Sequence, residues 1–157
     1  MGKKPGRGDK APEFQLPDDR EKARTLKSYA GHKLVLYFYP KDDTSGCTKE
    51  ALDFSALTGE FEKTDTAILG VSPDTTQSHG KFKTKHGLSI DLASDPAKAV
   101  LEAYGVWVEK SMYGRKFMGV ERTTFLIGRD GKIAEIWNKV RVPGHAEAVL
   151  AAARAVP

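Results

Sequence analysis

The chain has very little cysteine and no long apolar segment. Cys47 is the one cysteine among 157 residues, which excludes an internal disulfide and a zinc site built from several cysteines. The longest apolar run, LVLYFY at residues 34–39, is far too short to span a bilayer. No apolar run follows the basic first residues, so we expect no secretory signal and no membrane partner. We expect a soluble protein of the cytoplasm, where a lone cysteine stays reduced.

The composition is that of an ordinary globular protein, with 39% hydrophobic and 29% charged residues. We expect one domain over residues 11–157, preceded by a flexible basic tail over residues 1–10. A basic tail can bind nucleic acid or an anionic membrane, but a solvated tail is the simpler interpretation, so we expect no nucleic-acid partner. The sequence contains no glycine-rich phosphate loop or nucleotide fingerprint, and we expect no cofactor.

Hydrophobic periodicity predicts strands and helices in alternation. Strands are predicted at residues 32–40, 66–74 and 90–96, helices at 47–63, 76–87, 97–105 and 144–156, and a hairpin at 121–137. Pro96 is expected to open the third of these helices at its first turn. Because strand–helix–strand crossovers make strands parallel and a hairpin adds antiparallel ones, we expect an α/β fold with a central mixed sheet and helices on both faces. This is the thioredoxin-like pattern, which alone decides no function.

Cys47 lies after a predicted strand and its turn residues, at the start of a predicted helix. Pro40 ends the strand, and Gly46 allows a close backbone approach just before the sulfur. The free amides of a first helical turn carry partial positive charge and stabilise a thiolate. Cys47 shares a helical stripe with Ala51 and Phe54, however, and burial opposes charge, so a reactive thiolate needs a positive partner such as an arginine. From spacing alone, a reactive cysteine and an inert buried one both stay open.

The segment YPKDDTSGCTKEALDF at residues 39–54 resembles the active-site segment of the peroxiredoxins. The family pattern Pro-x-x-x-Thr-x-x-Cys is met by Pro40, Thr44 and Cys47. The later stretch GVWVEKSMYGRKFMGVERTTFLIGRDGKI is similar to the bacterioferritin-comigratory, or peroxiredoxin Q, branch. The resemblance runs from about Ala11 to the last predicted helix.

The resemblance implies a thiol-dependent peroxidase that reduces hydrogen peroxide and organic hydroperoxides. Cys47 would be the nucleophile, whose thiolate takes one peroxide oxygen and becomes a sulfenic acid. Thr44 would direct its hydroxyl at the peroxide, and Pro40 would shield the sulfur from bulk water. Taken singly, Thr44 would be a helix cap and Pro40 a strand terminator.

Arg122 matches the family arginine that stabilises the thiolate and the charge on the leaving oxygen. The backbone amides near Gly46 would complete this site, and Glu50 would orient the arginine. Without Cys47, Arg122 would be interpreted as a surface charge at a strand end.

The sequence departs from the branch at three positions. Ser45 stands where the branch commonly has proline. Leu52 and the region of Lys83 stand where other members carry a resolving cysteine. The resemblance therefore implies a one-cysteine variant that is reduced by an external thiol: glutathione, glutaredoxin or thioredoxin. The branch is often monomeric or weakly dimeric, so we expect a monomer or weak homodimer.

Three other interpretations stay open. The chain could be a redox sensor or thiol-dependent binding protein in which a slow, stable sulfenic acid signals to a partner. It could also be an inactive thioredoxin-like scaffold. A metal site is least favoured, because the four histidines are scattered, and we expect no metal and histidines at the surface or at helix ends: His32, His79, His86 and His145.

Overall fold

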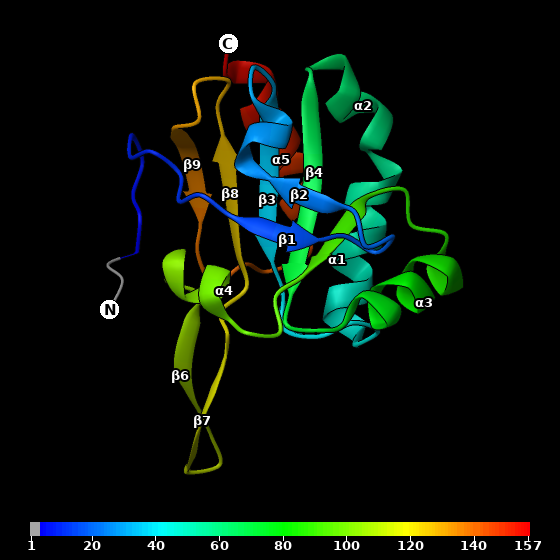
Figure 1. The fold of residues 1–157 in the computed structure, drawn as a ribbon, viewed down its shortest axis with the longest axis vertical. Helices are drawn as coiled ribbons and strands as arrows, with labels where there is room; N and C mark the ends of the chain where they lie inside the picture. Colours follow the sequence, from blue (N-terminus) through cyan, green and yellow to red (C-terminus); the bar gives the residue numbers. More distant parts are fainter. Residues whose placement is uncertain (1–3) are drawn as a thin grey trace.

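A five-stranded mixed sheet forms the centre of the computed structural model, which describes residues 4–157 (Figure 1). The strand order is β5-β4-β3-β8-β9. The strands are β3 (Lys33–Phe38), β4 (Thr66–Ser72), β5 (Asp91–Ser94), β8 (Thr123–Ile127) and β9 (Ile133–Trp137). The first three run parallel to one another, whereas β8 pairs antiparallel with both β3 and β9. The predicted mixed sheet and its terminal hairpin are confirmed.

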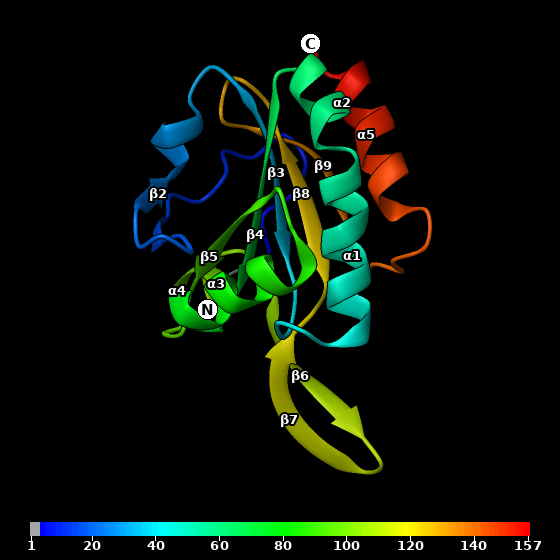
Figure 2. The ribbon, with the colours of Figure 1, turned by 90° about the vertical axis from the view of Figure 1, so that its right-hand side faces the viewer.

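Helices cover both faces of the sheet, as predicted (Figure 2). One face packs against α1 (Ser45–Ala56), α2 (Thr58–Lys63), α3 (Thr76–His86) and α5 (His145–Ala155). The other packs against the 3-10 helix η1 (Leu26–Tyr29), the short α4 (Ala99–Ala103) and the hairpin of β1 (Gln15–Pro17) and β2 (Ala23–Thr25). Because side chains alternate along a strand, Leu36 of β3 faces the second layer and Tyr37 the first.

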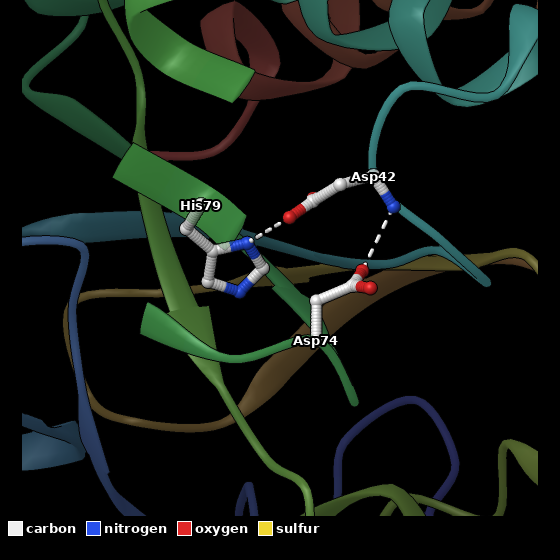
Figure 3. Close-up of side chains that lie close together, drawn as sticks. All are labelled: Asp42, Asp74 and His79. Carbon is white, nitrogen blue, oxygen red and sulfur yellow. Dashed lines mark hydrogen bonds and ion pairs between the residues drawn. The ribbon is translucent and has the colours of Figure 1, made fainter. Parts of the chain in front are cut away.

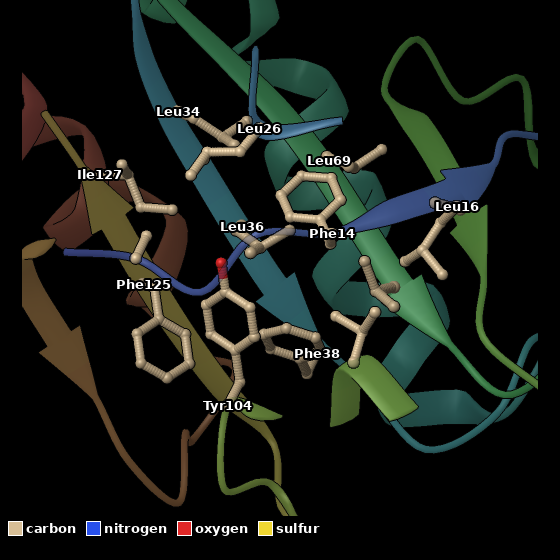
Figure 4. Packing of buried hydrophobic residues seen from close by; sticks show 14 of the residues in the cluster. Phe14, Leu16, Leu26, Leu34, Leu36, Phe38, Leu69, Tyr104, Phe125 and Ile127 are labelled. Carbon is tan, nitrogen blue, oxygen red and sulfur yellow. The ribbon is translucent and has the colours of Figure 1, made fainter. Parts of the chain in front are cut away.

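The second layer holds a continuous apolar cluster (Figure 4). Phe14 and Leu16 from the first hairpin and Tyr104 after α4 pack against Leu36 and Phe38 of β3. Every residue of β3 is buried, which is why its sequence is a continuous apolar run apart from Lys33. Because β3 is buried on both faces, its carboxyl end has a fixed position. The loop that leads to Cys47 starts from this end.

Several predicted boundaries were wrong. The helix predicted at 47–63 begins at Ser45 and is divided at Leu57 into α1 and α2. Pro96 lies in a turn and opens no helix: Lys98 has a φ of 64°, in the left-handed region, and α4 begins only at Ala99. Two hairpins were not predicted: β1–β2, and the projecting β6 (Trp107–Met112) with β7 (Arg115–Val120) (Figure 1).

Residues 4–10 lie against the domain, whereas their composition predicted a flexible tail. The amide of Gly8 donates to the carbonyl of Ile133 at 2.8 Å. The backbone of Lys10 pairs with that of Lys132 in an isolated antiparallel β-bridge. Lys4 pairs with Glu121 at 2.9 Å. Residues 1–3 lie outside the described residues, and a flexible tail there stays a prediction. None of the helices within residues 4–157 is both long and apolar enough to cross a membrane.

Lys33 links the central strand to the last helix, and its loss is expected to destabilise the fold. Its buried ammonium donates to the carbonyls of Ala153 and Val156 at 2.6 and 2.7 Å, at the end of α5 where helical carbonyls lack partners. Lys33→Met would leave both carbonyls unpaired and lower the free energy of unfolding by about 1–3 kcal/mol. Urea unfolding measures this, with the exposed Lys27→Met as control. Equal stability of the two variants would contradict the prediction.

Candidate active site

Cys47 lies in the first turn of α1, close to the carboxyl end of β3. β3 ends at Phe38, a loop follows, and α1 begins at Ser45 with Thr44 in the N-cap position. The amide of Thr48 donates to the Thr44 carbonyl and starts the helical ladder, so the amides before it have no acceptor within the helix. Cys47 is only 2% exposed. The sulfur therefore sits where helix amides favour negative charge and where little bulk water reaches it.

Arg122 contacts the sulfur across 75 residues of sequence because β3 and β8 are antiparallel. Phe38, the last residue of β3, pairs with Thr123, the first residue of β8, which puts Arg122 at the same end of the sheet as Cys47. Its Nη2 donates to Cys47 Sγ at 3.3 Å, and its Nη1 donates to Glu50 Oε1 at 2.6 Å. One guanidinium thus bridges the sulfur and a carboxylate.

Gly46 leaves room for this guanidinium. A Cβ at position 46 would lie 3.2 Å from Arg122 Nη2, tighter than most Cβ contacts, so the guanidinium would have to shift slightly. The close approach predicted for Gly46 is thus an approach of the arginine side chain.

Burial sets the electrostatics of the site. It raises the pKa of Glu50 to about 7, although Arg122 opposes the rise. Burial also disfavours the charge on Arg122, but Glu50 and Cys47 outweigh it and raise the pKa of the guanidinium. Burial, together with the charges of Glu50 and Cys47, raises the pKa of Tyr37 well above its ordinary value. Glu50 is 1% exposed, and its Oε2 lacks a hydrogen-bond partner within residues 4–157.

Thr44 lies in the N-cap position without capping the helix through its side chain. Its exposed hydroxyl instead donates to the carbonyl of Lys41 at 2.9 Å, within the same loop. Pro40 is half-buried in this loop, and its role as a shield of the sulfur stays a prediction. The structure thus brings Cys47, Arg122 and Glu50 into direct contact and places Thr44 at the adjoining helix start.

A groove leads from the surface to Arg122. Its volume is about 450 Å³, and its walls come from the base of the β6–β7 hairpin and the segment after β9: Val108, Glu109, Lys110, Glu121, Arg122, Lys139 and Val140. A small substrate can therefore approach the guanidinium from outside the core. The hairpin that forms one wall was not predicted from its mixed polar and apolar residues.

The histidines are only partly where the sequence predicted them. His32 is exposed, His86 ends α3 and His145 begins α5, but His79 is fully buried in the middle of α3, which contradicts the prediction. His145, although at a helix end, is buried as well, and burial together with the charge of Arg122 lowers its pKa to about 4.

Glu50→Gln is expected to remove part of the pH dependence of stability. A glutamate titrates near 4.5 in the unfolded chain and Glu50 near 7 in the folded one, so the folded state retains the proton between these values. Its stabilising contribution is complete below pH 4.5 and is lost as pH rises through about 7, by at most about 3 kcal/mol.

Urea unfolding at pH 5 and pH 8 measures this difference. The wild type should lose more stability between the two pH values than Glu50→Gln, and the exposed Glu62→Gln should behave like the wild type. The same pH dependence in all three proteins would contradict the prediction.

The sequence is similar to known proteins over most of its length. Residues 7–136 match the AhpC/TSA family. Peroxiredoxin Bcp of Xanthomonas campestris is 52% identical over 131 residues, which cover 83% of this chain and 82% of that protein. Peroxiredoxin Bcp of Bacillus subtilis is 46% identical over 138 residues, 88% of each chain.

Solved structures agree with the sequences. The bacterioferritin comigratory protein of Xanthomonas campestris, solved in work on its alkyl peroxide reduction activity, has a TM-score of 0.87 at 48% identity over 90% of each chain. A mutant of PrxQ from Xylella fastidiosa has a TM-score of 0.92 at 40% identity over 98% of each chain. These neighbours confirm the predicted thioredoxin-like fold. The chain therefore belongs to the AhpC/TSA family and is a peroxiredoxin, a thiol-dependent peroxidase similar to bacterioferritin comigratory protein and peroxiredoxin Q.

Proposed function

We propose that this peroxiredoxin reduces hydrogen peroxide and organic hydroperoxides through Cys47 and is then reduced by an external thiol. The observation that carries the proposal is the guanidinium of Arg122 held between Cys47 Sγ and Glu50. A fixed positive charge beside the single cysteine of the chain favours both a thiolate and a departing oxygen anion.

In the first step the Cys47 thiolate attacks the terminal oxygen of the hydroperoxide. The S–O bond forms as the O–O bond breaks, and the leaving hydroxide or alkoxide takes a proton to become water or an alcohol. Thr44 is proposed to hold the peroxide in line with the sulfur through its hydroxyl. Arg122 stabilises the charge on the leaving oxygen, the amide of Gly46 adds a donor, and Pro40 limits the access of water.

In the second step a thiol from outside the chain attacks the sulfenic sulfur. Water leaves and a mixed disulfide forms, and a second thiol then releases Cys47 as the product disulfide departs. Leu52 and Lys83 stand where other members of the branch carry a resolving cysteine, which supports an external reductant. Glutathione, glutaredoxin and thioredoxin are the proposed sources, and a cytoplasmic location would supply them. We further propose a monomer or weak homodimer.

A redox sensor is the second candidate. The burial of Cys47, at 2% exposure, favours it, because a sulfenic acid that large thiols reach slowly lasts long enough to signal.

Turnover separates the two candidates. Hydrogen peroxide consumption is measured with glutathione alone, with glutathione and glutaredoxin, and with thioredoxin, each beside Cys47→Ser. We expect sustained consumption with at least one reductant and none in the mutant, because one cysteine carries the whole cycle. Oxidation of one equivalent of Cys47 without turnover would instead establish the sensor. Consumption that persists in Cys47→Ser would contradict both.

A further inference from the structure

The loop before Cys47 is held by a buried polar cluster that the proposed chemistry does not use. Of residues 40–44, only Asp42 is buried, at 7% exposure. Its side chain points toward His79 of α3 (Figure 3). His79 is 0% exposed. A carboxylate and an imidazole with so little exposure need a complete set of partners.

Asp42 has that set. Its Oδ1 accepts from the hydroxyl of Tyr39 at 2.6 Å, and its Oδ2 accepts from Ser78 at 2.7 Å. His79 Nδ1 lies 2.7 Å from the same Oδ2. The loop carboxylate is thus bound by the end of the β3 segment and by two successive residues of α3.

His79 makes its second contact on another element. Its Nε2 lies 2.9 Å from the carbonyl of Ala93 in β5, and a carbonyl only accepts, so Nε2 donates. With Nδ1 facing the carboxylate of Asp42, both ring nitrogens face oxygen atoms of other elements. His79 therefore connects the loop, α3 and β5.

Asp74 lies in the same cluster, but the cluster does not fit a metal ion. The candidate ligand atoms of Asp42, Asp74 and His79 lie within 4.8 Å of one another. Asp74 Oδ2 already accepts from the amide of Asp42 at 2.8 Å and from Ser72 at 2.6 Å, and the ring nitrogens of His79 are both engaged. A cation would have to displace these hydrogen bonds, so the cluster functions through them.

The cluster reaches Thr44 through one peptide group. The amide of Asp42 and the carbonyl of Lys41 belong to the same planar peptide unit. Asp74 binds that unit on its N–H side, and the Thr44 hydroxyl donates to its C=O side at 2.9 Å. The orientation of this peptide therefore sets the orientation of the Thr44 hydroxyl.

We propose that Asp42, Asp74 and His79 form a clamp that fixes the Lys41–Asp42 peptide and so positions the Thr44 hydroxyl for the peroxide. The three are positioning residues, because they act through Thr44 and touch neither Cys47 nor substrate. The inference rests on the proposed function, in which Thr44 holds the peroxide. The next residue strengthens the clamp: Asp43 binds Lys85 at 2.6 Å and His86 at 2.8 Å, so α3 holds two successive loop residues.

Two substitutions of His79 separate its two contacts. In His79→Asn the amide nitrogen lies at the δ position and keeps a donor for Asp42, whereas in His79→Gln it lies at the ε position and keeps only the donor for Ala93. We expect His79→Gln to slow oxidation of Cys47 by hydrogen peroxide roughly tenfold or more, because misplaced reacting groups lose orientation. His79→Asn should stay within about threefold of the wild type. The matched control is His32→Gln, which breaks an exposed pair with Asp65 of the same 2.7 Å length and should change nothing.

A second reagent distinguishes positioning from general damage. Iodoacetamide needs the Cys47 thiolate but not Thr44, so its rate should change less than about twofold in His79→Gln. In a Thr44→Val background, His79→Gln should add little further loss, since both act on one hydroxyl. Equal losses of rate with peroxide and with iodoacetamide, or full additivity with Thr44→Val, would overturn the clamp.

Hydrogen exchange tests the clamp independently of activity. Amides of residues 41–47 should exchange faster in His79→Gln than in the wild type or His32→Gln. If His79→Gln does not fold, the half-buried Asp74→Ala removes the acceptor of the Asp42 amide and should show the same pattern. A wild type that does not react with peroxide would defeat the proposed function, while unchanged exchange in the variants would defeat the clamp.

Discussion

The site depends on one guanidinium shared between a sulfur and a carboxylate. A contact with Cys47 alone would leave the guanidinium of Arg122 able to rotate. Its hydrogen bond to Glu50 fixes the plane of the guanidinium beside the sulfur. Burial of Glu50 makes this contact strong and also costly, because a nearly buried carboxylate without that arginine would be unpaired. The candidate site therefore holds charge in a fixed geometry at a cost in the free energy of unfolding.

Two parts of the fold position the groups around the sulfur of Cys47: the central sheet and helix α3. The antiparallel pairing of β3 and β8 delivers Arg122 to the end of the sheet where α1 begins, and Gly46 leaves the space that the guanidinium needs. From the other side, α3 holds the loop that carries Thr44 through Asp42 and Asp43. The sulfur thus lies between an electrostatic partner fixed by the sheet and a loop fixed by a helix.

Much of this arrangement could be predicted from local sequence. The apolar run of β3, the turn residues before Cys47 and the hairpin around residues 129–131 predicted the mixed sheet and the helix start at the cysteine. The pattern of Pro40, Thr44 and Cys47 identified the family. The contact of Arg122 with Cys47 was expected from resemblance, and the strand register explains it.

Other features depend on contacts that no local pattern contains. His79 lies in a polar helical sequence that is typical of a surface, and its contacts with Asp42, 37 residues earlier, and with Ala93, 14 residues later, account for its burial. The β6–β7 hairpin carries exposed Met112, Phe117 and Met118 among charged residues, so it lacks the alternation that predicts strands. The division between α1 and α2 falls at Leu57, which is neither glycine nor proline, so no helix-breaking residue at that position predicts it.

The rate of Cys47 oxidation by hydrogen peroxide in Arg122→Met tests the central claim most directly. Methionine removes the charge and the donors while retaining an unbranched side chain, and the exposed Arg129→Met is the matched control. If Arg122 stabilises the thiolate and the leaving oxygen, the second-order rate constant should fall by about 100-fold or more, with no change in the control. A folded Arg122→Met protein that reacts within a few-fold of the wild type would contradict the account.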